Sequence, residues 1–139
     1  IFTTSLPPAL AAGANASIRH LMQSQHERSQ HQAAAHHLKQ CLRDAAIPQI
    51  ECDTHIVPVL IGDPVLCQKA SDMLMEQFDI YVQPINYPTV PKGTERLRFT
   101  PTPYHTEAMI RHLTQALDHV FTALDISRCA ETILARKAA

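Results

Sequence analysis

Hydrophobic positions downstream of residue 55 follow two periods in turn. Runs that are apolar throughout, or that alternate at every second residue, predict strands over residues 55–61, 80–85 and 96–100. Helical spacing separates the first two strands and returns after the third. The resulting order β-α-β-β-α predicts an α+β fold, in which a small, mainly antiparallel sheet is covered on one face by two helices.

The two helices of this half have clear start signals. Asp63 followed by Pro64 predicts one start, because aspartate caps a helix N-terminus and proline fits the first turn. Thr106 predicts the other. Each helix carries an apolar stripe at helical spacing, which we interpret as core rather than as a cofactor-binding surface. The stripes are Val65, Leu66, Ala70, Met73, Leu74 and Phe78 in the first helix, and Met109, Ile110, Leu113, Leu117, Val120, Phe121 and Leu124 in the second.

The N-terminal part is predicted to form two further helices. The first covers residues 10–22, after two prolines that suit a helix's first turn. Ser24 and Glu27 have capping-box spacing for the second, which runs to about Ala46. Its other face is polar, which is typical of a helix that bridges two halves of a larger molecule. The narrow apolar stripe of this second helix consists of Ala34, Leu38, Cys41, Leu42 and Ala45.

Composition excludes several classes of protein. A chain of 139 residues with 45% hydrophobic residues can bury the core of one domain, and its net charge of −1 argues against nucleic-acid binding. No apolar run approaches the roughly 20 residues of a membrane span. The four cysteines form no CxxC pair and are predicted to be free thiols in a reducing compartment, with Cys41 and Cys67 on helix faces. The histidines lack metal-site spacing, and we expect solvated side chains at His105, His112 and His119.

Residues 81–103, YVQPINYPTVPKGTERLRFTPTP, carry the candidate chemistry. Several prolines stiffen the segment, Lys92-Gly93 supplies a turn, and a strand pattern resumes around Arg98. A guanidinium held on a rigid strand can bind a carboxylate through two parallel hydrogen bonds. The alternative from spacing alone is a surface hairpin with solvated arginines.

The same segment resembles a known family. INYPTVPKGTERLRFTPTP is similar to the C-terminal signature of the 5-aminolevulinate synthases, which are α-oxoamine synthases among the pyridoxal-phosphate enzymes of fold type I. HIVPVLIGDP, FTTSLPP and AAGANASIRHL extend the resemblance over roughly residues 1–125. It implies an acyltransferase that condenses glycine with succinyl-CoA to 5-aminolevulinate, CoA and CO2 for tetrapyrrole and heme biosynthesis. NYPTVP favours these two substrates over those of sister enzymes.

The resemblance also implies roles for individual residues. Arg98 matches the arginine that binds the glycine carboxylate, and Thr89 matches a residue that hydrogen-bonds the succinyl carboxylate. Thr3 and Thr4 match residues that reach the phosphate of pyridoxal 5'-phosphate in the neighbouring subunit of a homodimer, although β-propensity and helix capping explain them equally well. We expect Arg96 to be a solvated strand residue.

The family's Schiff-base lysine is expected upstream of Ile1, because no lysine here matches its position. The chain is therefore expected to be a C-terminal fragment without activity of its own. Its expected parts are the end of a large domain with linking helices over residues 1–46, a small domain over 47–127 and a tail over 128–139. The lysines present are Lys39, Lys69, Lys92 and Lys137.

Two classes of function remain open at this point. The first is the acyltransferase, in a bacterial cytoplasm or, in a eukaryote, the mitochondrial matrix. The second is a stand-alone small-molecule-binding regulatory module, since β-α-β-β-α sandwiches also serve as sensors. The start at Ile1-Phe2, without an initiator methionine, favours the first.

Overall fold

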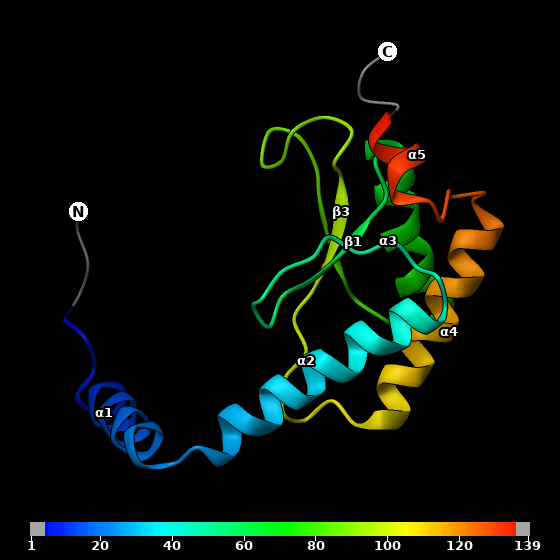
Figure 1. The fold of residues 1–139 in the computed structure, drawn as a ribbon. Helices are drawn as coiled ribbons and strands as arrows, with labels where there is room; N and C mark the ends of the chain where they lie inside the picture. Colours follow the sequence, from blue (N-terminus) through cyan, green and yellow to red (C-terminus); the bar gives the residue numbers. More distant parts are fainter. Residues whose placement is uncertain (1–4, 136–139) are drawn as a thin grey trace.

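The fold is an antiparallel sheet with helices on one face (Figure 1). In the computed structural model, which describes residues 5–135, the strand order is β1-β3-β2 and both pairings are antiparallel. Helix α3 packs on the sheet and on α4, and α4 also packs on α2. The predicted α+β sandwich is confirmed. The elements are α1 (Pro8–Gln23), α2 (His26–Asp44), β1 (Val57–Leu60), α3 (Pro64–Phe78), β2 (Gln83–Ile85), β3 (Arg96–Phe99), α4 (Glu107–Ala123) and α5 (Ala130–Ala135).

The strands are shorter than their apolar runs. The expected strand over residues 80–85 narrows to β2, because the chain must first return from the end of α3. Asp79 ends that helix in the left-handed conformation, and the Ile80 amide donates to the Leu74 carbonyl at 3.0 Å. Val82 is buried, and its carbonyl accepts a hydrogen bond from Ser71 at 2.8 Å. Ladder pairing therefore starts only at Gln83.

Two of the three predicted helix caps are confirmed. Asp63 Oδ1 accepts hydrogen bonds from the amides of Val65 and Leu66, at 2.9 and 2.8 Å. Thr106 accepts from the amide of Met109 at 3.3 Å. These side chains occupy amide groups that have no partner within their helices, and so fix where α3 and α4 begin.

The predicted capping box at the start of α2 is wrong. The helix begins one residue later than that box requires, with Gln25 at the N-cap and no side-chain cap. Ser24 instead bonds the Glu27 carboxylate at 2.6 Å, and His20 of α1 contacts the same carboxylate at 2.7 Å. Hydrogen bonds from His20 and Ser24 lower the pKa of Glu27 to about 2. Ser24 and Glu27 therefore help to connect α1 to α2 and do not cap α2.

The core lies between the sheet and helices α2, α3 and α4. The apolar stripes are largely buried, but Val65 and Met109 are 60% and 54% exposed, so their assignment to the core is wrong. Both stand in the first turn of their helices. Cys41 and Cys67 lie on helices as predicted, and burial raises the pKa of the Cys67 thiol to about 12.

Residues 128–133 are held by contacts that no local sequence pattern predicted. Arg128 donates to the carbonyl of Ala45, just past α2, at 2.9 Å and pairs with Asp118 of α4 at 2.7 Å. Ile133 of α5 is buried against Gly62. By contrast, α1 buries none of its side chains and stands apart from the sheet (Figure 1). None of the described helices is long and apolar enough to span a membrane.

Candidate functional site

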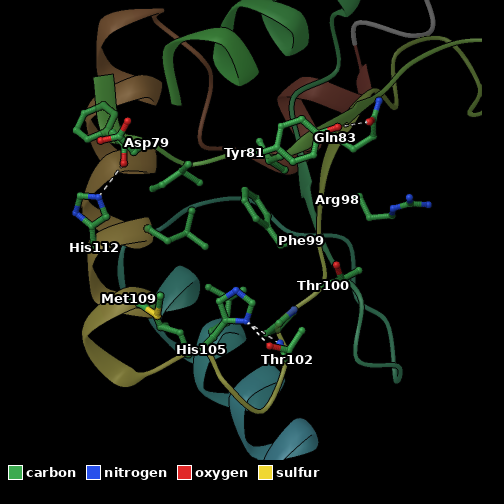
Figure 2. Close-up of a pocket in the computed structure, with 17 residues that line it drawn as sticks. Asp79, Tyr81, Gln83, Arg98, Phe99, Thr100, Thr102, His105, Met109 and His112 are labelled. Atoms are coloured by element: carbon green, nitrogen blue, oxygen red, sulfur yellow. Dashed lines mark hydrogen bonds between the residues drawn. The ribbon is translucent and has the colours of Figure 1, made fainter. Parts of the chain in front are cut away.

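A cleft of about 930 Å³ opens where the end of α3, the edge of the sheet and the start of α4 meet. Its walls are mostly apolar, and polar side chains lie among them (Figure 2). An apolar hollow with a few polar groups is the usual form of a small-molecule site. The apolar lining includes Phe78, Ile80, Val82, Phe99, Ile110 and Leu113, and the polar lining includes Gln83, Arg98, Thr102, His105 and His112.

Arg98 is the one arginine among the residues that line this cleft, and its guanidinium points away from the apolar wall to which Phe99 belongs (Figure 2). Strand alternation buries Leu97 and Phe99 toward the helices and exposes Arg98 on the opposite face, as the sequence predicted. Figure 2 shows Arg98 and Phe99 leaving β3 in opposite directions. Pairing with both β1 and β2 makes β3 the central strand, so the base of the Arg98 side chain is held rigidly. No side chain among residues 5–135 forms an ion pair with its guanidinium.

The histidines near the cleft are held by local contacts. His105 precedes α4 rather than lying on it, and its Nδ1 accepts from the Thr102 amide at 2.8 Å. On α4, His112 donates from Nε2 to the Phe78 carbonyl at 3.2 Å, which satisfies a carbonyl at the end of α3. The rings of His112 and His119 both pack edge-on against Phe78. The expectation of purely solvated histidines is therefore only partly right, because these contacts also serve the fold.

Thr89 lies in the loop between β2 and β3 and is exposed. It does not line the cleft that contains Arg98, so the chain does not bring these two predicted residues into one pocket. The loop has internal order: the Thr89 amide donates to Asn86 at 3.0 Å, and Thr94 Oγ1 donates to Pro91 at 2.6 Å. Lys92 lies 5.2 Å from the centre of the Tyr87 ring.

Arg96 differs from the expectation of a solvated residue. It is half-buried, its Nε donates to the Thr94 carbonyl at 2.8 Å, and burial lowers its pKa. It shares the open face of the sheet with Arg98, because the two are separated by one residue on β3.

Two polar residues at the base of the loop were not anticipated. Glu95 is 1% exposed, and neither its Oε2 nor the buried Oδ1 of Asn86 has a hydrogen-bond partner within the described part of the chain. Extending the β2–β3 register places these residues opposite each other. Counting back in steps of two from Phe99 through Leu97 would have placed Glu95 on the inner face.

The remaining predicted residues do not enter the cleft. Thr3, Thr4 and Lys137 lie outside the described residues. Lys39 donates to the carbonyls of Cys52 and Thr54, and Lys69 is exposed on α3. Lys92 is held over Tyr87, as described above. None of the three described lysines lines the cleft with Arg98.

The chain is similar in sequence to known proteins. The chain is 55% identical over 128 residues to 5-aminolevulinate synthase 1 of Cereibacter sphaeroides and 57% identical over 130 residues to 5-aminolevulinate synthase of Rhizobium meliloti. These matches cover 92% and 94% of the chain, but the chain spans only 31% of the length of either relative. The resemblance to 5-aminolevulinate synthases is thus confirmed.

Solved structures show the same fold. A serine palmitoyltransferase from S. paucimobilis, with a bound PLP–myriocin aldimine, matches with a TM-score of 0.80 at 30% identity, over 90% of this chain and 32% of that one. An 8-amino-7-oxononanoate synthase from Francisella tularensis matches with a TM-score of 0.72 at 21% identity, over 91% and 36%, and supports the fold alone. The family model for aminotransferase class I and II matches residues 1–117. The chain belongs to the aminotransferase class I and II family.

Proposed function

We propose that this chain is the C-terminal part of an acyltransferase that uses pyridoxal 5'-phosphate to condense glycine with succinyl-CoA, giving 5-aminolevulinate, CoA and CO2. The observation that carries the proposal is Arg98, a cation on the central strand that lines the cleft and has no ion-pair partner within residues 5–135. Relatives named 5-aminolevulinate synthase at 52–57% identity favour this enzyme over a stand-alone regulatory module. Their bacterial sources support a cytoplasmic location.

The residues of this chain fit a role beside the cofactor rather than as its anchor. None of the three described lysines lines the cleft, so the lysine that binds the cofactor would belong to the part of the relatives' length that this chain does not span. Thr3 and Thr4 would contact the cofactor phosphate across a homodimer interface. When bound, pyridoxal phosphate stabilises negative charge at the amino acid's Cα. The small domain over residues 47–127 then supplies contacts to the substrates.

Arg98 would orient the glycine by its carboxylate. A guanidinium makes two parallel hydrogen bonds to a carboxylate, which prevents rotation of the amino acid about its N–Cα bond. The Cα–H bond that must break is then presented in one direction, and such alignment lowers the barrier without new chemical groups. The rigid strand is suited to this task, because a misplacement of about 1 Å reduces rates strongly.

A direct assay tests the proposed reaction. The full-length protein with pyridoxal phosphate, glycine and succinyl-CoA should form 5-aminolevulinate and release free CoA in equal amounts. Serine and acetyl-CoA are the matched alternative substrates and should support much slower turnover. Absence of 5-aminolevulinate from a folded, cofactor-loaded protein would reject the proposal.

Thr89 would act on the acyl donor rather than on glycine. Its exposed hydroxyl is available to a carboxylate, since only its backbone amide is engaged in the loop. Thr89→Val keeps the shape but loses the hydroxyl, so the KM for succinyl-CoA should rise about fivefold or more, with the KM for glycine little changed. Thr89→Ser is the control and should stay near wild type. Steady-state kinetics measure both constants, and an equal change in the two would contradict this role.

A further inference from the structure

The base of the Arg96 side chain lies among apolar neighbours on the open face of the sheet. The β3 register places it between Leu60 of β1, which is 1% exposed, and Ile85 of β2, which is half-buried. The stem of the arginine can pack on these neighbours, but the charged head loses part of its hydration. This desolvation lowers the pKa of Arg96. A cation in such a place is stable when an anion or several acceptors compensate for the lost water.

The acceptors present compensate only one side of the guanidinium. Nε donates to the Thr94 carbonyl at 2.8 Å. The two terminal nitrogens have no hydrogen-bond acceptor in the described part of the chain, and no carboxylate there forms an ion pair with them. The charge of Glu95 partly opposes this lowering of the Arg96 pKa, but strand alternation directs the Glu95 side chain to the inner face of the sheet. The free edge of Arg96 is therefore the pair of terminal nitrogens.

Arg98 cannot supply the missing anion and adds charge of the same sign. Residues two apart on a strand lie about 7 Å apart and point to the same face. Glycine's single carboxylate, which the proposed function assigns to Arg98, is too small to serve both guanidiniums with full bidentate contacts. The attraction of an oxyanion at Arg96 would offset the cost of desolvation and reduce the repulsion from Arg98.

We propose that Arg96 binds a second oxyanion, a carboxylate or a phosphate, end-on through its two terminal nitrogens. This inference goes beyond the proposed function, because it assigns a binding role to a residue outside the glycine contact. Thr94 fixes the orientation of the fork, since its carbonyl occupies Nε. The oxyanion comes either from a substrate or cofactor, or from an acidic side chain of the enzyme outside residues 5–135.

The full-length variants Arg96→Gln and Arg96→Lys test this proposal, with Arg111→Gln as the matched control. Arg111 is exposed on α4 and pairs locally with Glu107, so its loss should change neither binding nor stability. If the oxyanion belongs to a ligand, Arg96→Gln should bind one substrate, or pyridoxal phosphate, about tenfold or more weakly than the wild type. The unfolding midpoint of the ligand-free protein should then be unchanged. An oxyanion on the protein predicts a lower midpoint with unchanged KM values.

Three further measurements keep the test decisive. The destabilisation of Arg96→Gln should shrink at high salt if an ion pair was lost, whereas loss of the Thr94 hydrogen bond alone would give a salt-independent effect. Arg96→Lys should recover part of the loss, because it keeps the charge but not the fork. Inorganic phosphate serves as an independent probe: if the oxyanion is a ligand, phosphate should stabilise the wild type more than Arg96→Gln, even if the proposed reaction is not observed. Agreement of Arg96→Gln with Arg111→Gln in every measurement, or a purely salt-independent effect, would overturn the proposal.

Discussion

Replacing Arg98 by leucine is expected to abolish most of the affinity for glycine while leaving pyridoxal phosphate bound. The side chain is exposed on the outer face of β3, so its loss removes a ligand contact without opening the core. A charged hydrogen bond is worth roughly 1.5–3 kcal/mol, which corresponds to about a 10- to 150-fold loss of affinity. Arg98→Lys keeps the charge but loses the planar fork, and glycine should bind at least about tenfold more weakly.

Glycine titrations of the full-length variants, followed by the cofactor's absorbance spectrum, measure this effect. Arg43→Leu is a suitable control, because Arg43 is exposed on α2 and donates a hydrogen bond to the side chain of Gln40 on the same helix, at 2.9 Å. The control should bind glycine normally. Near-normal glycine affinity in Arg98→Leu would disprove the carboxylate contact and remove the main reason for placing this cleft in an active site.

Substituting alanine for Gly62 is expected to be among the most destabilising small changes in the chain. Gly62 has φ +79°, which an alanine adopts only at a cost of about 1–2 kcal/mol. An added Cβ would also overlap with Cγ2 of Ile133, which is 3% exposed. Forcing an extra carbon into such a contact costs roughly a further 1–3 kcal/mol unless α5 moves away.

A second variant separates the two causes. Gly62→Ala/Ile133→Ala removes the overlap but keeps the backbone strain. The loss of stability from Gly62→Ala should therefore be smaller when measured in the Ile133→Ala background than in the wild type. Gly13→Ala is the control: Gly13 lies in α1 with no atom within 4 Å of an added Cβ, and alanine there should stabilise by up to about 1 kcal/mol. Urea unfolding of the full-length proteins measures all four. Equal midpoints for Gly62→Ala and wild type would contradict the described packing of α5.

Local signals with a direct physical cause predicted the fold well. Asp63 and Thr106 cap their helices because a side-chain oxygen and free backbone amides lie within the same turn. Period-two alternation predicted that Arg98 points outward, because successive side chains of a strand lie on opposite faces. Each of these features depends on a few consecutive residues, which a single sequence displays directly.

Features that depend on distant segments could not be predicted. Met109 has the spacing of a core residue, but it lines the cleft and is 54% exposed. Docking of α5 requires a residue without a side chain at position 62, more than sixty positions earlier in the chain. Glu95 is a different case: strand alternation would have placed it on the inner face, but residue type argued against burial, because a glutamate is almost never fully buried without a partner.

The ordered β2–β3 loop has a consequence for how tightly a ligand can be held. Its turns are closed by internal hydrogen bonds, and Asn86 ties it to the first residue of α3 through the Pro64 carbonyl at 3.4 Å. Fixing a residue's backbone opposes binding by about 1–2 kcal/mol of lost conformational entropy when it happens on contact. Here that entropy is lost during folding instead. A ligand that contacts Thr89, such as the proposed acyl donor, would therefore meet a preorganised surface, and more of the contact energy would appear as affinity.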